Sequence, residues 1–204
     1  MNERERVDGE GWLAEARRAP SPYCNERPGD GRITLVVLHG VSLPPDEFGG
    51  PWVEAFFTGT LRYSAHSWFE GIRDLRVAPH LLIRRDGELV QFVSFLDRAW
   101  HAGRSSWMGR EECNDYSIGI ELEGNDTSPY TDAQYLALAD VLPALIAAYP
   151  GILEGGVAGH ADVAPGRKTD PGESFDWRRL DGMLDASGYN LPARSREQAR
   201  GKQA

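Results

Sequence analysis

The segment from Gly159 to Gly172 carries a histidine, a lysine and an aspartate close together: His160, Lys168 and Asp170. Two Pro-Gly pairs in the same stretch disfavour a helix, so we expect an ordered loop. An imidazole and a carboxylate are ligand types that zinc accepts, and a nearby cation could stabilise developing negative charge. Because catalytic zinc takes three protein ligands, a third ligand must come from elsewhere in the chain.

A second histidine ends the segment that most resembles a central strand. Residues 33–38 form a nearly unbroken apolar run rich in β-branched side chains, which is typical of a strand buried on both faces. His39 follows directly and precedes a loop, the position at which α/β folds tend to place their chemistry. A structural histidine bonded to a backbone carbonyl explains this position equally well.

His80 and His101 are rival candidates for the third ligand. His80 begins a hairpin over residues 80–93, whose Asp86-Gly87 pair suits the two central positions of a type I′ turn. His101 lies in a short segment of aromatic and small residues. For both histidines we favour a structural role.

Residues 117–124 alternate in the manner of a strand with two different faces. One face carries Ile118, Ile120 and Leu122, and the other carries Gly119, Glu121 and Glu123. A buried carboxylate loses hydration and its pKa rises, so an acid in the middle of a sheet is costly unless it is paired or used. Glu121 is therefore a candidate general base, whereas Glu123, nearer the strand end, is expected to be solvated.

Helical patterns surround these segments. Thr131 and Gln134 form a capping box, and apolar residues then recur at three- and four-residue steps up to Tyr149, which predicts a long helix. Further helices are expected over residues 51–58, 67–75 and 175–184, and residues 155–159 are expected to form a short strand.

Composition limits the number of domains and the kinds of partner. A chain of 204 residues, 41% hydrophobic and 26% charged, suits one folded domain. The net charge of −9 disfavours nucleic acid as a partner. We expect residues 1–30 to form an extended arm without regular structure, packed on the body through Trp12, and residues 31–187 to form the folded domain. Residues 188–204 read as a basic, solvated C-terminal tail.

The same features bear on location. The N-terminal residues have neither the apolar core of a signal peptide nor the ~20 apolar residues of a membrane span. Cys24 and Cys113 lie far apart, unlike the dense cysteine framework of a secreted domain, so we expect reduced, structural thiols. We therefore expect a cytoplasmic monomer with no membrane partner.

Three of the candidate residues could share one ion. His39, His160 and Asp170 supply two imidazoles and a carboxylate, which leaves zinc a fourth position for water. The pKa of that water would fall towards neutrality, and Glu121 could take its proton as the water attacks a carbonyl. Lys168 could face the developing oxyanion, although an ordinary exposed lysine is the interpretation that its position alone favours. The five histidines allow many triples, so spacing by itself is only suggestive.

At these residues the sequence resembles the AmpD-type N-acetylmuramoyl-L-alanine amidases, within the larger group of phage lysozyme-like amidases and peptidoglycan recognition proteins. The resemblance covers nearly the whole chain. Its motifs are, in order, Gly11-Trp12-Leu13, Arg17-Arg18, Ser42-Leu43-Pro44-Pro45, Glu47-Phe48-Gly49-Gly50-Pro51-Trp52, Leu82-Ile83-Arg84-Arg85-Asp86-Gly87, Arg98-Ala99-Trp100-His101-Ala102-Gly103, Ser117 to Gly124, His160, and Arg167-Lys168-Thr169-Asp170-Pro171-Gly172.

The resemblance implies a single α/β domain with a central mixed β-sheet and flanking helices, in which residues 31–187 are the zinc amidase domain. It implies Zn2+ bound by His39, His160 and Asp170, with Glu121 and Lys168 as catalytic residues. In that picture Glu121 activates zinc-bound water, while zinc and Lys168 stabilise the tetrahedral intermediate.

The resemblance also implies a substrate, the 1,6-anhydro-muramyl peptides of cytoplasmic cell-wall recycling. The bond cut would be the amide between the lactyl group of the muramic acid and L-alanine of the stem peptide. Arg76 matches a family arginine that meets the carboxylates of this small-molecule substrate. Alternative hypotheses are an amidase acting on polymeric cell wall and a non-catalytic muropeptide-binding module. The absence of an export signal argues against the first, and the presence of all five site residues argues against the second.

The chain departs from the family pattern at two positions. Gly40 stands where the family usually has asparagine after the first ligand histidine, and Glu112 stands where it usually has a second arginine. Both positions lie near the substrate in the family, so we expect them to affect the choice of muropeptide and to leave the zinc chemistry unchanged.

Overall fold

A six-stranded sheet forms the centre of the computed structural model, which describes residues 3–189, in the order β1-β5-β4-β9-β3-β10. Neighbouring strands are parallel except β4 and β5, which form the expected hairpin. The strands are β1 (Arg17–Arg18), β3 (Leu35–Val41), β4 (Leu81–Ile83), β5 (Leu89–Gln91), β9 (Ser117–Glu123) and β10 (Val157–Gly159). With helices packed around it, this mixed sheet confirms the predicted α/β fold.

The remaining elements flank the sheet. Two small ladders pair β2 (Cys24–Glu26) with β6 (Asp97–Ala99), and β7 (Ser106–Trp107) with β8 (Arg110–Glu111). The α-helices are α1 (Trp52–Phe57), α2 (Asp132–Ala148), α3 (Ile152–Gly155), α4 (His160–Val163) and α5 (Trp177–Ala186), and the 3-10 turns are η1 (Glu3–Arg6), η2 (Tyr63–Ala65), η3 (Ser67–Ile72) and η4 (Cys113–Asp115). Between residues 3 and 189, none of the helices has the length and apolar content that a membrane span requires.

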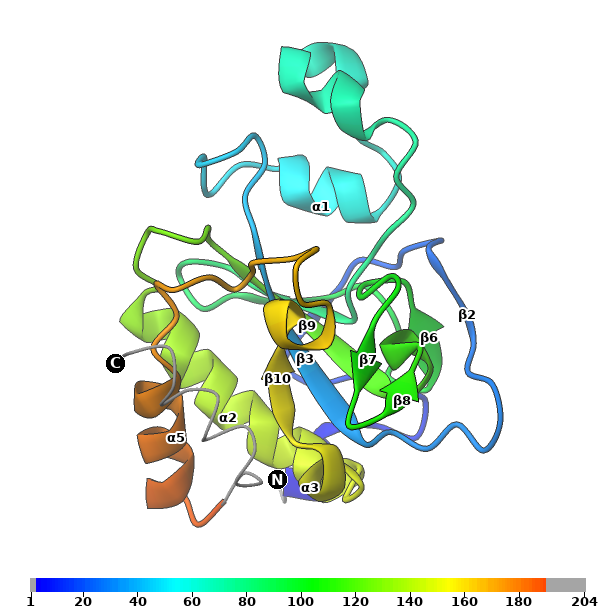
Figure 1. Cartoon of the computed structure of the whole chain (residues 1–204), viewed down its shortest axis with the longest axis vertical. Helices are drawn as coiled ribbons and strands as arrows, with labels where there is room; N and C mark the ends of the chain where they lie inside the picture. The colour runs from blue at the N-terminus through cyan, green and yellow to red at the C-terminus, as the bar shows by residue number, and fades with distance from the viewer. Residues whose placement is uncertain (1–2, 190–204) are drawn as a thin grey trace.

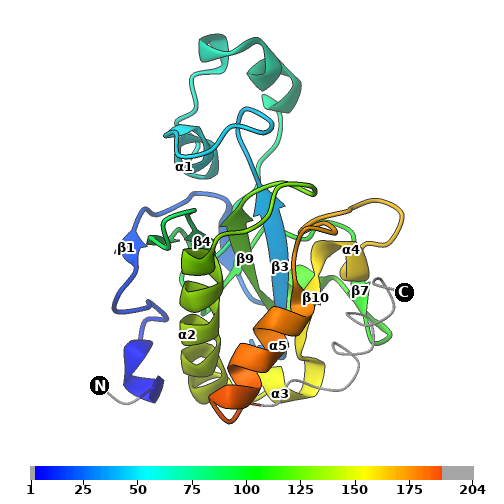
Figure 2. The ribbon, with the colours of Figure 1, turned by 90° about the vertical axis from the view of Figure 1, so that its left-hand side faces the viewer.

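Strands β3 and β9 lie in the middle of the sheet, and the apolar segment of β3 is buried on both faces as predicted. One face carries Val36 and Leu38 of β3 with Ile118, Ile120 and Leu122 of β9. These side chains join one core cluster with residues of α2 and α5. In Figure 2 both helices lie across this face of the sheet.

The opposite face carries Leu35 and Val37, which pack with Trp107 of β7, Cys113 of η4 and Tyr116. Nearer β4 and β5, the same face is covered by α1 and η3 through a second cluster of apolar side chains. In Figure 1, α1 and the turns that follow it lie beyond the ends of the central strands, and the β7–β8 ladder lies to one side. The sheet is therefore covered on both faces.

The parallel register of β3 and β9 pairs Leu35 with Ser117, Val37 with Gly119 and His39 with Glu121. Because side chains alternate along a strand, these pairs share the face opposite α2 and α5. His39 and Glu121 thus lie side by side near the carboxyl ends of two parallel strands, where ligands commonly bind in open α/β sheets.

Helix α2 begins as its sequence predicts. The Thr131 hydroxyl accepts from the Gln134 backbone N–H at 3.2 Å, and the Gln134 side chain accepts from the Thr131 N–H at 3.0 Å, which completes the capping box. The Gln134 amide also donates to the carbonyls of Ile83 at 3.2 Å and Glu123 at 2.9 Å. The helix start is therefore fixed to the ends of β4 and β9.

The N-terminal arm has regular structure, contrary to our expectation. Strand β1 extends the sheet edge beside β5, and β2 pairs with β6. Leu13, only 1% exposed, is the buried anchor, whereas Trp12 is half-buried beneath the Arg18 guanidinium. The edge strand β5 offers unpaired backbone groups, and β1 binds to them. This pairing depends on the backbone, so the side-chain pattern of a two-residue strand does not predict it. The predicted tail falls, from residue 190 on, outside the described residues.

The turn of the β4–β5 hairpin also differs from the prediction. In the turn, the Arg84 N–H donates to the Glu88 carbonyl and the Gly87 N–H donates to the Arg84 carbonyl, both at 2.9 Å. Gly87 has a φ of 90°, whereas Asp86 is not among the described residues with positive φ. A type I′ turn needs positive φ at both positions, so the turn type was wrong although the hairpin itself is confirmed.

Packing of α2 on the sheet should be a main source of stability. Leu138→Ala removes a fully buried side chain from the core and should lower the free energy of unfolding by about 2–5 kcal/mol. Leu136→Ala on the same helix, where the side chain is 61% exposed, is the control and should change it by no more than about 0.5 kcal/mol. Urea unfolding measures both, and equal losses would show that α2 is not held by this face.

Candidate active site

His39, His160 and Asp170 converge on one point, as predicted. His39 lies near the end of β3, His160 begins α4 directly after β10, and Asp170 ends the loop that follows α4. The structure brings one nitrogen from each histidine and one oxygen of Asp170 within 4.8 Å of one another, a group that could hold a metal ion. The two histidines are buried, and the aspartate is partly buried.

The individual distances suit ligands of a single ion. His39 Nδ1 and His160 Nδ1 are 2.9 Å apart, and Asp170 Oδ2 lies 3.0 Å from His160 Nδ1 and 3.3 Å from His39 Nδ1. Tetrahedral zinc with bonds of about 2.0–2.1 Å places its ligand atoms roughly 3.3 Å apart. Small movements would therefore fit the three atoms to such an ion.

The protonation states of the site also suit metal binding, which requires a neutral imidazole and an ionised carboxylate. Burial, reinforced by the neighbouring His160, lowers the pKa of His39 to about 4. Burial alone would raise the pKa of Asp170, but contacts with the His160 and His39 rings hold it well below its usual range. At neutral pH His39 is neutral and Asp170 is ionised.

The loop from residue 164 to 172 carries Asp170 back to the histidines. The Ala161 N–H donates to the Asp170 carbonyl at 2.9 Å, and the Lys168 N–H donates to the Ala164 carbonyl at 3.1 Å. Contrary to our expectation of a loop throughout, residues 160–163 form one helical turn, which begins before the first proline of the segment. The Gly159 N–H donates to Asp162 Oδ2 at 2.9 Å and stabilises the start of this turn.

A backbone carbonyl orients His160. His160 Nε2 lies 3.1 Å from the Ala102 carbonyl oxygen, which can only accept, so Nε2 carries the ring proton. In the neutral ring Nδ1 then presents a lone pair to the other two ligands. Arg167 donates to the same carbonyl at 2.6 Å, which holds the Ala102 segment in place. Second-sphere contacts of this kind are typical of metal-ligating histidines.

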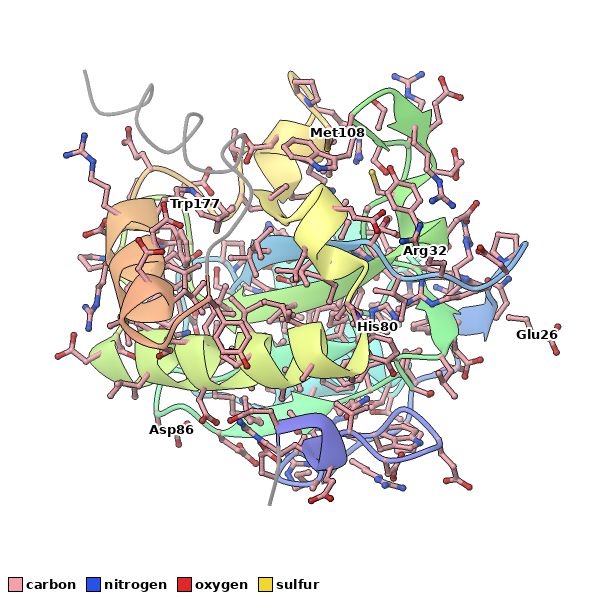
Figure 3. All side chains as sticks on the ribbon, turned by 90° about the horizontal axis from the view of Figure 1, so that it is seen from below. Glu26, Arg32, His80, Asp86, Met108 and Trp177 are labelled. Atoms are coloured by element: carbon pink, nitrogen blue, oxygen red, sulfur yellow. The ribbon has the colours of Figure 1, made fainter. Side chains whose placement is uncertain are left out.

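The rival histidines lie outside the group. His80 is fully buried, and its Nδ1 accepts from the Gly119 N–H at 3.0 Å while Nε2 lies 3.0 Å from the Asp97 carbonyl. Figure 3 shows His80 inside the molecule, whereas Glu26 and Asp86 lie at its edge. His101 Nδ1 lies 2.9 Å from His39 Nε2, on the side of that ring away from the ligand atom.

Glu121 presents an unsatisfied acid beside this group. Its Oε2 atom is buried and has no hydrogen-bond partner, which is costly for a carboxylate. Burial first, and then the charge of Asp170, raise the pKa of Glu121 well above its usual value, while Lys168 opposes the shift. A carboxyl whose pKa is raised by its surroundings is suited to accept a proton in catalysis.

Glu123 is not solvated, contrary to our expectation. It is 1% exposed, and its carboxylate accepts from the Gly49 N–H at 2.6 Å and the Arg85 N–H at 3.2 Å. The sequence indicated its place near the strand end but not the loop that folds back over it. The two acids of this strand face therefore differ, because Glu123 is hydrogen-bonded and Glu121 Oε2 is not.

A cavity of about 340 Å3 opens onto the candidate ligands and is lined by His39, Glu121, His160, Lys168 and Asp170 at its polar end. Its other wall is apolar and includes Phe56, Phe57, Trp68, Ile72, Leu75 and Val77. Lys168 is exposed and also lines the adjoining groove. The arrangement suits a ligand with a polar reacting bond and a larger, partly apolar body.

Of the other positions singled out from sequence, Gly40 lines this cavity, whereas Arg76 and Glu112 do not. Arg76 is exposed, lies outside the cavity lining and donates to the carbonyls of Arg73 at 2.8 Å and Leu75 at 2.9 Å, so its role with substrate stays a prediction. A Cβ at Gly40 would clash with the Tyr130 hydroxyl, which donates to the Pro171 carbonyl at 2.9 Å. The side chain of Glu112 is exposed and lies 3.6 Å from the Arg98 guanidinium.

Sequence reasoning missed Ser117. Its hydroxyl lies 3.2 Å from His101 Nε2 and donates to the Cys113 carbonyl at 2.5 Å. Ser117 lies on the same face of β9 as Gly119 and Glu121. The alternation that identified Glu121 was therefore also the signal for Ser117.

The fold and the site together define a class of protein, the α/β proteins in which two histidines and an aspartate near the ends of parallel strands can hold one metal ion. Comparison with known proteins gives the family. The chain belongs to the N-acetylmuramoyl-L-alanine amidase family, which matches residues 29–173. The resemblance found in the sequence is thereby confirmed.

Relatives agree along most of the chain. It is 60% identical over 180 residues to the 1,6-anhydro-N-acetylmuramyl-L-alanine amidase AmpD of Citrobacter freundii, which covers 88% of this chain and 96% of AmpD. A crystal structure of a selenomethionine AmpD derivative matches with a TM-score of 0.84 and 61% identity, over 87% of this chain and 98% of that one. The Escherichia coli amidase AmiD in complex with anhydro-N-acetylmuramic acid-L-Ala-D-gamma-Glu-L-Lys matches with a TM-score of 0.56 and 30% identity, over 78% of this chain and 59% of that one.

The two acids of β9 should respond oppositely to amidation. The raised pKa of Glu121 means that, between its usual value and the folded value, the folded chain binds more protons than the unfolded chain. Stability in the metal-free protein therefore falls as pH rises through that window. Glu121→Gln should abolish this loss, so its stability relative to wild type should rise as pH increases from the usual carboxyl pKa through the window.

Glu123→Gln is the matched control on the same strand face. It weakens the contacts with Gly49 and Arg85 and should lower the free energy of unfolding by about 1–3 kcal/mol. Urea unfolding of the chelator-treated chains across pH 5–8 measures both effects. A destabilised Glu121→Gln variant would contradict the assignment of an unsatisfied acid.

Proposed function

We propose that this chain is a zinc-dependent amidase of cytoplasmic peptidoglycan recycling. It hydrolyses the amide between the lactyl group of 1,6-anhydro-muramic acid and L-alanine of the stem peptide. The observation that carries the proposal is the convergence of His39, His160 and Asp170 beside the unpaired Oε2 of Glu121.

The donor set supports zinc as the ion. Two imidazole nitrogens and one carboxylate oxygen are a ligand set found in catalytic zinc sites, which keep a further position open. A zinc ion held there supplies Lewis acidity, which lowers the pKa of water and polarises an amide carbonyl. The protein's part includes holding two of the ligands in their deprotonated states, through the burial of His39 and the low pKa of Asp170.

Glu121 is the general base in this proposal. Its position opposite His39 in the register places the carboxyl at the same cavity as the ligands. Its buried, unpartnered oxygen is free to accept a proton from the attacking water and then to deliver it to the leaving amine. The raised pKa of Glu121 strengthens it as a base, because burial and the charge of Asp170 favour its protonated form.

Lys168 stabilises negative charge on the amide oxygen as the bond to water forms. It lines both the cavity and the adjoining groove, and its charge is close enough to affect the pKa of Glu121 and His39. A fixed cation facing a developing oxyanion lowers the barrier, since the interaction strengthens in the transition state.

The substrate assignment rests on the relatives and on the cavity. AmpD of Citrobacter freundii, 60% identical, carries the name of a 1,6-anhydro-N-acetylmuramyl-L-alanine amidase, and the AmiD structure holds an anhydro-muropeptide. The apolar wall, where Trp68 is 44% exposed, provides a surface for a sugar ring while the amide lies at the polar end. Free thiols at Cys24 and Cys113 suit a reducing compartment such as the cytoplasm.

Replacing the base and replacing a ligand should have different effects. Glu121→Ala should retain stoichiometric zinc and lose at least about 100-fold in kcat, because a general base contributes about that much or more. Asp170→Ala should lose both zinc and activity. Elemental analysis and mass spectrometry of the products from one defined anhydro-muropeptide measure these outcomes, with Leu136→Ala as a surface control. Stoichiometric zinc in the Asp170 variant would contradict the ligand assignment.

The form of the substrate separates the two amidase hypotheses. Incubation with soluble anhydro-muropeptides should release free stem peptide far faster than incubation with intact sacculi at equal muramyl-peptide concentration. Preferential release from sacculi would instead favour an enzyme of the polymeric wall. Zinc-loaded protein that bound the muropeptide without releasing stem peptide would be a binding module.

A further inference from the structure

Behind the candidate ligand His39, four groups form a continuous chain of short contacts. His39 Nε2 lies 2.9 Å from His101 Nδ1, and His101 Nε2 lies 3.2 Å from the Ser117 hydroxyl. The Ser117 hydroxyl in turn lies 2.5 Å from the Cys113 carbonyl oxygen. His39 is 1% exposed, His101 8% and Ser117 0%, so water is largely excluded from the chain.

The carbonyl at the buried end of this hydrogen-bond chain fixes the direction in which each group donates. A carbonyl oxygen only accepts, so the Ser117 hydroxyl donates its single proton to Cys113. The Ser117 oxygen must then accept from His101, which places the His101 proton on Nε2. A neutral imidazole has one ring proton, so His101 Nδ1 accepts from His39 Nε2 and the His39 proton lies there.

Strand β9 is shaped to hold the His101 ring in this chain. A Cβ placed on Gly119 would clash with three atoms of the His101 ring. Gly119 lies between Ser117 and Glu121 on the same face of the strand, so its missing side chain makes the space that the imidazole fills. The Asn114 side chain adds support by accepting from the His101 and Ala102 N–H groups, at 3.2 and 2.8 Å.

We propose that His101 and Ser117 are positioning residues that fix the tautomer of His39, so that Nδ1 carries a lone pair aimed at the metal. The inference rests on the proposed metal site and goes beyond it, since neither residue is a ligand. Without the chain, His101 could carry its proton on Nδ1 and donate to His39 Nε2, which would leave the His39 proton on the atom that must bind the ion.

The consequence is a cluster prepared for a cation. His160 offers Nδ1 to the same ion, because its Nε2 donates to the Ala102 carbonyl. With both ring protons on Nε2, the two Nδ1 atoms and Asp170 Oδ2, 2.9–3.3 Å apart, are open to one shared cation. Partners that orient a ligand in this way are worth about 10–100-fold in metal affinity.

The tautomers can be observed directly in the full-length chain. Long-range proton–nitrogen correlation spectra of protein labelled at histidine should show His101 protonated at Nε2 and unprotonated at Nδ1, both before and after zinc is added. Before zinc is added, His39 should likewise be protonated at Nε2. A His101 proton on Nδ1 in the wild-type chain would overturn the proposal, whatever the metal affinity.

Metal affinity supplies the second readout. Ser117→Ala removes the oxygen that directs the chain and should weaken zinc binding by about 10–100-fold in competition with a chelating dye. The matched control is Ser105→Ala, which removes another buried hydroxyl that contacts Cys113, at 3.2 Å from its N–H, without touching His101. The control should bind zinc as wild type does, and equal loss in the two variants would reduce Ser117 to a packing role.

The result is separable from the proposed function. A wild-type chain that binds no zinc, or that cleaves no anhydro-muropeptide, would refute the proposed function. A wild-type chain that binds zinc and cleaves substrate, but whose Ser117→Ala variant keeps the His101 tautomer and the affinity, would refute the positioning role alone.

Discussion

The parallel pairing of β3 and β9 is the constraint on which the rest of the structure depends. Seven consecutive residue pairs, from Leu35 with Ser117 to Val41 with Glu123, set the two strands in register. That register places His39 beside Glu121, and the same alternation turns Ser117 and Gly119 towards His101. A shift of β9 by one residue would turn Ser117 and Glu121 to the apolar face beneath α2 and α5, away from His39. The hydrophobic residues on one face of the sheet therefore fix the positions of His39 and Glu121 on the other.

The unpaired buried carboxylate oxygen of Glu121 lowers the stability of the fold, and hydrogen bonds near it offset this loss. Glu121 Oε2 is buried without a partner, and several lone pairs meet at the candidate metal site. Buried polar groups nearby are hydrogen-bonded. Glu123 accepts from two backbone N–H groups, and Gln134 donates to the carbonyls of two strands. Between residues 3 and 189, two buried side-chain atoms lack a hydrogen bond, Arg84 Nε and Glu121 Oε2, and the second belongs to the residue that we propose as the general base.

Local patterns predicted the parts of this structure that depend on nearest neighbours. The apolar run before His39, the alternation through Glu121 and the capping box of α2 each identified the right element. The ligand set came from resemblance rather than spacing, because five histidines can be combined in many ways. Contacts between segments far apart in the chain could not be predicted from the sequence. For this reason we missed the pairing of β1 with β5, the loop over Glu123 and the contact of Ser117 with His101. Each depends on segments that only the tertiary fold brings together.

The position of β10 at the edge of the sheet has a consequence for how the enzyme comes into being. His160 and Asp170 follow a strand whose only neighbour in the six-stranded sheet is β3, more than a hundred residues earlier in the chain. During synthesis, β3 and His39 therefore leave the ribosome more than a hundred residues before β10. A nascent or truncated chain then holds only one of the three proposed metal ligands, so we expect amide hydrolysis to begin only when the carboxyl-terminal third has docked.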